Sequence, residues 1–301
     1  MNRTDALEII TEQAGSAPLH FAGHVEIGLR IRDALNDPDC HLDAAGKLIQ
    51  AEPALSAQVV AIANSAAYNP GGRAITDVKT AVARLGFTTL RSLAAAHIVK
   101  NLAGAPASPA IKALTDRLWR HTTHVAALCR TIARRVTRQD PESALFIGLV
   151  HEVGTFYLLS RAAEYPALIE TAPPKPADRP APSFEEEAAA TPTEDGDDDP
   201  EVRLEGELTL TVLRQLKVPE TVIAAVEEYY AGYMGLPPTS MADTLLLAES
   251  LAPVSSPLSS VVDSDDADPV SIDAVIGEST LSEILRESAA EVESLAKALG
   301  T

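Results

Sequence analysis

The fold class is decided by residues Ala51 to Leu102, which read "AEPALSAQVVAIANSAAYNPGGRAITDVKTAVARLGFTTLRSLAAAHIVKNL". This stretch divides into helices separated by clear stop signals. One helix stops before Pro53, because the residue before a proline leaves the helical region. The turn residues of "YNPGG" end the next helix. Thr76 is the expected N-cap of a third, and Gly86 its left-handed stop, after which "TTLRSL" begins another helix.

The composition extends this helical pattern to the whole chain. Of the 301 residues, 46% are hydrophobic, 22% are charged and only 4% are aromatic. Strands favour aromatic and β-branched residues, whereas Ala and Leu favour helices. No segment shows a trustworthy strand pattern or repeat. The prediction is an all-α protein, a compact multi-helix bundle with ample length for a buried core.

The charge and the cysteines limit the partners and the compartment. A formal net charge of −19 repels phosphate backbones, so no nucleic acid is expected as partner, although Arg84 and Arg91 flank a turn that looks like a helix-turn-helix. Cys40 and Cys129 fit no metal-binding spacing and predict free thiols in a reducing compartment. The N-terminus lacks a secretory pattern, and no uninterrupted apolar run approaches about 20 residues. A cytoplasmic protein without a membrane partner is expected.

Two acidic stretches interrupt the helices. The first, Thr171 to Pro200, holds seven prolines, nine acids and two basic residues. Such a segment has almost nothing to bury, so it predicts a disordered acidic Pro-rich insertion, 171–200. The second is "DSDDADP", Asp263 to Pro269. It precedes a terminal helix whose stripe is expected to be core or cap, although a homo-dimer seam is an open alternative. The stripe contains Leu281, Leu285, Ser288, Val292, Leu295 and Leu299.

Three helices carry side chains suited to chemistry. Apolar residues at three- and four-residue steps place His121 on the buried face of its helix. The segment "DPESALFIGLVHEVG" is expected to start at Asp140 and close at Gly154, which puts His151 and Glu152 in its last turn. The apolar segment "SMADTLLLAESLA" carries Glu249 in its interior. His124 follows His121 by three residues, a spacing more typical of a packing or surface histidine.

These features resemble the HDOD family, bacterial regulatory domains related to HD-type metal-dependent phosphohydrolases. The matching features are the acid-Pro-x-Leu opening, the Asn-Ser turn and the Ala-x-x-x-Leu-Gly helix of Ala51 to Leu102. The order continues in "LWRHTTHVAALCRTIA", "ALFIGLVHEVGTFYLL", "GELTLTVLRQLKVPETVIAAV" and "LLLAESLA". The resemblance implies an HDOD domain over 18–252, with helical subdomains 18–104 and 110–252. It leaves an N-terminal extension, 1–17, and an acidic linker with a C-terminal helix, 253–301.

The resemblance also assigns a degenerate HD-type site to His121, His151, Glu152 and Glu249. HD enzymes hold divalent ions with histidines and aspartates, which polarise phosphoryl oxygens and activate water. Both acids here are one methylene longer than that pattern. Where bimetallic relatives use further histidines, this chain has "EEYYAGY", whose tyrosines are poor ligands. Thr155 also excludes the zincin pattern HExxH.

Three interpretations follow for this site. In the leading one, the histidines and glutamates satisfy one another in the core, and no metal or other cofactor is expected. The protein is then a non-catalytic signal-transduction module, a pseudo-enzyme that serves as scaffold for protein partners. The second is a divalent metal bound without catalysis. The third is a metal-dependent phosphohydrolase acting on a nucleotide or cyclic dinucleotide; binding of a small nucleotide without cleavage is a weaker variant.

Overall fold

The structure is a computed structural model that describes residues 1–17, 19, 23–169, 199–232, 238–258, 275–276 and 279–300. Most of the predicted insertion 171–200 and all of 263–269 lie outside these described residues. The described elements are α1 (Arg3–Ser16), α2 (Gly23–Leu35), α3 (Leu42–Gln50), α4 (Pro53–Ala63), α5 (Val78–Leu102), α6 (Pro109–Ile132), η1 (Ala133–Thr137), α7 (Pro141–Val150), α8 (Val153–Arg161), η2 (Pro166–Leu168), α10 (Pro200–Gln215), α11 (Glu220–Tyr230), α12 (Met241–Ser250), β1 (Val275–Ile276), β2 (Ser279–Thr280) and α13 (Leu281–Gly300).

The all-α prediction is confirmed. β1 and β2 are two residues long each and pair antiparallel next to the start of α13, so they form a local turn rather than a sheet layer. The core is one continuous cluster of Leu, Ile, Val and Ala side chains drawn from nearly every helix. Burial of this apolar surface is the main favourable term in folding.

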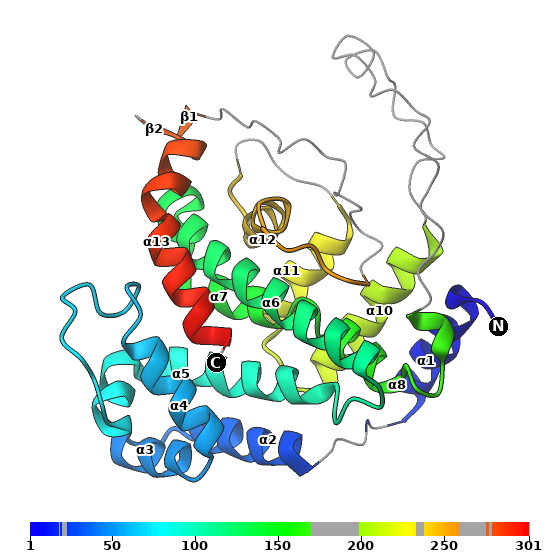
Figure 1. The fold of residues 1–301 in the computed structure, drawn as a ribbon, viewed down its shortest axis with the longest axis horizontal. Coiled ribbons are helices and arrows are strands. Elements are labelled where there is room, and N and C mark those ends of the chain that lie inside the picture. The colour runs from blue at the N-terminus through cyan, green and yellow to red at the C-terminus, as the bar shows by residue number, and fades with distance from the viewer. Residues whose placement is uncertain are drawn as a thin grey trace.

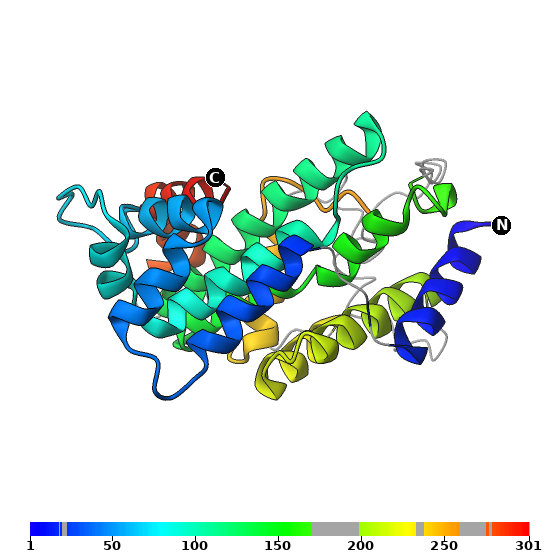
Figure 2. The same ribbon diagram turned by 90° about the horizontal axis from the view of Figure 1, so that it is seen from below.

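Helix α6 lies at the centre of the bundle and packs against α7, α8, α12 and α13 (Figure 1). Helix α5 packs against α2, α3 and α4 on one side and against α7 on the other. Helix α1 packs along α10 at the end of the molecule that holds the N-terminus (Figure 2). This arrangement brings α7, α8, α12 and α13, which are far apart in the sequence, together around α6.

The terminal helix α13 belongs to this core. Its predicted stripe faces α6 and α4, with Leu281, Ser288, Leu295 and Leu299 all buried. The side-chain amide of Gln58 donates a hydrogen bond of 2.9 Å to the carbonyl of Leu299. The stripe is therefore core, as its spacing predicted.

The break predicted at Gly86 is confirmed as a bend within α5, and the N-cap of α5 lies one residue after the predicted position. Gly86 has φ 72° and ψ 172°, so α5 is bent at the predicted left-handed stop and continues beyond it. The N-cap of α5 is Asp77 rather than Thr76, because the Asp77 carboxylate accepts a hydrogen bond from the Thr80 amide. A carboxylate satisfies an unpaired first-turn amide and also complements the helix dipole.

The prediction that Gly154 closes the helix after Asp140 is wrong. Asp140 caps α7 as predicted, but α7 ends at Val150 and α8 begins at Val153. Gly154 lies inside α8, where a Cβ atom would stand 2.3 Å from Thr209 Oγ1 on α10. The glycine therefore serves a close approach between α8 and α10. His151 and Glu152 occupy the junction between two helices, not the last turn of one.

The stretch from Pro141 to Arg161 is the one candidate membrane span among the described residues, judged by length and apolar character. Most of it is buried inside the bundle, and it is interrupted at His151 and Glu152. Its apolar character is accounted for by its place in the core. The cytoplasmic location stays a prediction.

Candidate functional site

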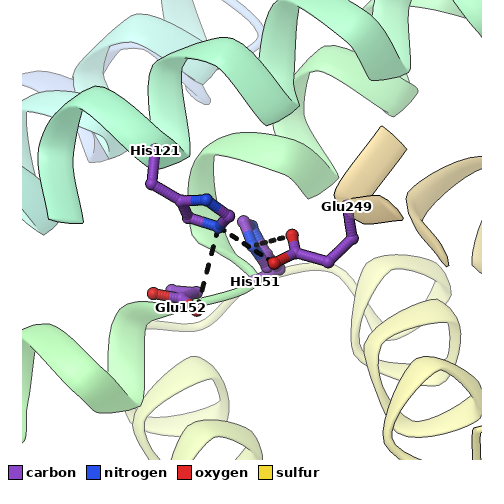
Figure 3. A group of neighbouring side chains, drawn as sticks. All are labelled: His121, His151, Glu152 and Glu249. Atoms are coloured by element: carbon purple, nitrogen blue, oxygen red, sulfur yellow. Dashed lines mark ion pairs between the residues drawn. The ribbon is translucent and has the colours of Figure 1, made fainter. Parts of the chain in front are cut away.

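The four predicted site residues converge. His121 comes from α6, His151 and Glu152 from the α7–α8 junction, and Glu249 from the last turn of α12 (Figure 3). One ligand atom from each residue lies within 4.8 Å of those of the other three. Among the described residues, this is the one group of three or more His, Cys, Asp or Glu side chains placed to hold a metal ion.

Glu249 lies between the two histidines. Its Oε1 is 3.2 Å from Nε2 of His121, and its Oε2 is 3.3 Å from Nε2 of His151. Glu152 is more distant, with its Oε1 3.9 Å from Nε2 of His121. Both histidines are fully buried, and Glu152 is nearly so. One carboxylate, that of Glu249, is thus within ion-pair distance of both imidazoles.

The other nitrogen of each imidazole is held by the backbone. Nδ1 of His121 lies 2.7 Å from the carbonyl of Val254, and Nδ1 of His151 lies 2.9 Å from the carbonyl of Gly148. A carbonyl oxygen only accepts, so each Nδ1 carries the hydrogen. In the neutral imidazole, Nε2 then offers its lone pair to the centre of the cluster. Metal-binding histidines are oriented in this way.

Three buried atoms in the cluster lack a hydrogen-bond partner among the described residues: Nε2 of His121, Nε2 of His151 and Oε2 of Glu249. The 3.2 and 3.3 Å separations qualify as ion pairs, but the atoms are not aligned as hydrogen bonds. Buried polar atoms are nearly always satisfied. The expected mutual satisfaction of histidines and glutamates is therefore incomplete.

The separations fit a shared cation better than direct pairs. A charge-assisted hydrogen bond between nitrogen and oxygen spans about 2.7–2.9 Å. Two ligands of one ion, each about 2.1 Å from it, lie about 3.0–3.4 Å apart at octahedral or tetrahedral angles. Two imidazoles and two carboxylates are also a donor set that divalent transition ions accept. The two histidines and Glu249 therefore fit a divalent ion, and Glu152, with its Oε1 3.9 Å from Nε2 of His121, lies beside them as a more distant fourth ligand.

Without a cation, the cluster is strongly polarised. Burial opposes protonation of His121, but Glu249 and Glu152 together raise its pKa to about 9. Burial likewise opposes ionisation of Glu249, yet the two histidines lower its pKa to about 2. Burial dominates at Glu152 and raises its pKa. The metal-free cluster therefore contains an imidazolium–carboxylate pair, His121 with Glu249, at neutral pH.

Sequence analysis missed the segment 253–258, which follows α12 and borders the cluster. Besides the Val254 carbonyl, it supplies the Ser256 hydroxyl, which donates a 3.0 Å hydrogen bond to Oε2 of Glu152. Arg117 of α6 donates to the carbonyl and hydroxyl of Ser255 and so ties this segment to α6. Serines in an irregular segment carry no spacing signal, so this role was not predictable from the sequence.

The tyrosines of "EEYYAGY" lie beside the cluster without joining it. The ring of Tyr229 meets the ring of His151 edge-on at 6.0 Å, and Tyr230 packs against Tyr229. Burial raises the pKa of both phenols, so both stay protonated. The Tyr230 hydroxyl instead shares a hydrogen bond of 3.2 Å with the hydroxyl of Thr209.

The remaining sequence candidates lie elsewhere. His124 is only partly buried and its Nδ1 donates to the Arg120 carbonyl of its own helix. Arg84 donates to a loop carbonyl, that of Tyr68. Cys40 and Cys129 are both free thiols. None of these residues contributes to the four-residue cluster.

The HDOD domain model matches residues 24–189, more than half of the chain. Among solved structures, a Shewanella amazonensis SB2B protein provisionally described as a metal-dependent phosphohydrolase aligns with a TM-score of 0.68 and 19% identity, covering 99% of both chains. An HDOD domain protein of unknown function from Geobacter sulfurreducens aligns with a TM-score of 0.60 and 19% identity, covering 99% of this chain and 97% of that one. At such identities the likeness establishes the shared fold. No curated protein matches the sequence.

Proposed function

Because this chain belongs to the HDOD family, we propose that it is a non-catalytic regulatory module of bacterial signal transduction, which acts through contacts with protein partners. The supporting observation is the burial of the HD-type cluster beneath the segment 253–258. His121 and His151 are 0% exposed, Glu152 is 3% exposed, and the side chain of Glu249 is 11% exposed. The cluster belongs to the core of the bundle.

Hydrolysis requires the substrate to approach the metal ligands, and the burial of the cluster opposes this approach. A catalytic metal keeps at least one coordination position open for water and substrate. Here Val254 holds the His121 ring, and Ser256 holds the Glu152 carboxylate on the side where the chain leaves α12. A phosphate ester would have to displace this segment before reaching the ligands.

The cluster instead supports a structural role. If a divalent ion is bound, His121, His151, Glu152 and Glu249 would hold it. Bound there, the ion would supply charge neutralisation for two buried carboxylates. The four residues join α6, the α7–α8 junction and α12, so the centre would fasten three separate parts of the chain. A ligand that binds only the folded state stabilises it by mass action.

Metal analysis and activity assays test the proposal together. Purified protein is analysed for manganese, iron and zinc, and is then incubated with a panel of nucleotides and cyclic dinucleotides plus each ion. We expect no turnover, whether or not metal is present. His151→Ala should remove any stoichiometric metal, whereas His124→Ala, a histidine of the same region outside the cluster, should not. Turnover that vanishes in Glu152→Gln would overturn the non-catalytic proposal.

The rival function is a metal-dependent phosphohydrolase. It is favoured by one observation, the convergence of two imidazoles and two carboxylates with three unsatisfied buried atoms. In that case the four residues would be ligands, and 253–258 would have to move. Substrate-dependent phosphate release in the same panel would support this alternative.

A further inference from the structure

A separate cavity of about 300 Å³ lies between α2, α5, α7 and the turn that joins α10 to α11. None of the four cluster residues lines it. We propose that this cavity binds a small amphipathic anion, a molecule with a carboxylate or phosphate head on an apolar body. Pockets for small molecules are of this size or larger, with apolar walls and a few polar groups.

The charge at the cavity is positive although the chain is strongly acidic. Arg32, Arg91 and Lys217 line it, and Glu142 is the one acidic residue among the described residues that line it. Both oxygens of Glu142 are already engaged: Oε1 accepts from Arg130, and Oε2 accepts from the hydroxyls of Tyr68 and Thr89. In a protein with a net charge of −19, such a concentration of cations favours an anionic ligand.

Arg91 has the donors to bind the head. Its Nε donates a 3.0 Å hydrogen bond to the Leu35 carbonyl at the end of α2, which orients the side chain, and its guanidinium lies 5.8 Å from the Phe87 ring centroid. Within the described part of the chain, its two terminal nitrogens have no hydrogen bond or ion pair. A guanidinium fork matches a carboxylate or phosphate in geometry. Arg32, by contrast, is engaged by Asp33 and by the Leu216 carbonyl.

Lys217 is an unusual residue for its backbone position. It follows α10 with φ 52°, and its amide donates to the Arg214 carbonyl while the next amide, of Val218, donates to the Leu213 carbonyl. This pair of bonds is the Schellman helix end, whose left-handed residue is usually glycine. A lysine here is conformationally unfavourable and points to a function. Its exposed ammonium has no ion-pair partner in the described ranges.

The apolar side chains that line the cavity indicate that the ligand has an apolar body besides its anionic head. The cavity is lined by the apolar side chains of Ile98 and Val99 of α5, Phe146 and Val150 of α7, and Val222 of α11. A purely inorganic anion would leave these side chains facing water. An apolar body attached to the anionic head would cover them.

The test uses the full chain and the probe 8-anilinonaphthalene-1-sulfonate, an aromatic anion that fluoresces in apolar surroundings. We expect saturable binding of one probe per chain. Arg91→Gln should weaken it about tenfold or more, the cost of a charge-assisted hydrogen bond. Lys217→Gly should weaken it several-fold without lowering Tm, because glycine suits the left-handed backbone. Near-ultraviolet circular dichroism confirms that each variant is folded.

The matched control is Arg84→Gln. Arg84 lies on the same helix as Arg91 and also donates to one backbone carbonyl, but it does not line the cavity. Its variant should bind the probe like the original chain. Octanoate should displace the probe, and inorganic phosphate alone should not. The proposal is overturned by absent binding, by equal losses in the Arg84 and Arg91 variants, by unchanged binding in Lys217→Gly, or by displacement by phosphate as effective as that by octanoate.

Discussion

Helix α6 carries two buried polar centres that differ in how completely their atoms are paired. At His121, the cluster leaves three buried atoms without a hydrogen bond. At Arg130, the guanidinium donates to Glu142 at 3.1 Å and to Glu291 at 3.2 Å, and it lies over the Tyr68 ring at 4.4 Å from its centroid. The same helix thus holds one satisfied network and one unsatisfied cluster.

The satisfied network joins four helices, α5, α6, α7 and α13. Its carboxylates are saturated, because Tyr68 and Thr89 donate to the second oxygen of Glu142, and Arg134 donates to the second oxygen of Glu291. It therefore ties α5, α7 and α13 to α6, and each of its two carboxylates accepts hydrogen bonds at both oxygens. A buried polar centre whose charges are paired is typical of a structural role, whereas buried atoms without a hydrogen bond call for a partner such as a water molecule or an ion.

The largest expected effect comes from breaking the satisfied network. Arg130→Ala leaves the carboxylates of Glu142 and Glu291 without their shared cation, so we expect a loss of about 3–5 kcal/mol in the free energy of unfolding. Urea denaturation measures it. Arg134→Ala is the control, since its half-exposed side chain pairs with the same Glu291 and should cost less than about 1 kcal/mol. Equal losses in the free energy of unfolding would contradict the view that Arg130 stabilises the protein more than Arg134 does.

The second prediction concerns pH in protein stripped of metal with EDTA. The folded-state pKa of His121, about 9, lies above its ordinary 6.5, so its stabilisation is complete below pH 6.5 and is lost as pH rises toward 9. Glu249, with a pKa of about 2 against 4.5, loses its contribution only as pH falls below 4.5. Between pH 6.5 and 9 the loss is about 2–3 kcal/mol. Thermal unfolding at pH 6, 8 and 9 measures it, and a His121→Gln variant should show a smaller decline, since the raised pKa of Glu152 still contributes.

The third prediction concerns the addition of a divalent ion to the four-residue cluster. A divalent ion at about a hundred times its Kd should stabilise the chain by about 2.7 kcal/mol, seen as a rise in Tm when manganese or zinc is added after EDTA treatment. His151→Ala should abolish the rise. A similar rise in that variant would place the ion elsewhere.

The smallest effect should come from Ser256. Ser256→Ala removes one hydrogen bond to Glu152 and should cost about 1 kcal/mol, together with about a tenfold loss in metal affinity, as for other groups that orient ligands. Titration calorimetry measures the affinity. Ser250→Ala, which removes a hydroxyl bonded only to the Leu247 carbonyl of its own helix, should leave metal affinity unchanged.

Helix positions and the four cluster residues were predictable from the sequence, for physical reasons. Capping residues and prolines act within a few residues of themselves, so Asp140 and Pro53 mark helix starts in any fold. The buried face of α6 follows from helical spacing, and this placed His121 inside the core. The resemblance to HDOD proteins then linked His121 with His151, Glu152 and Glu249.

The sequence-based prediction failed where contacts between distant segments of the chain determine the local structure or the role of a residue. Gly154 reads as a helix stop by itself, but the approach of Thr209 on α10 makes it an interior residue of α8. Val254 and Ser256 carry no local pattern, and they matter only because the chain after α12 passes over the cluster. Lys217 likewise gains a functional reading only from its left-handed backbone beside the cavity.

By itself, therefore, the sequence determined the helical class, the helix starts and the inward-facing histidine of α6, because helix propensity, capping and periodicity act over a few residues. Only the tertiary structure decided that Glu249 reaches both imidazoles, that Arg130 pairs with two carboxylates and that three cations share a cavity. Those outcomes depend on ångström-scale separations between helices, which are set by packing across the whole core.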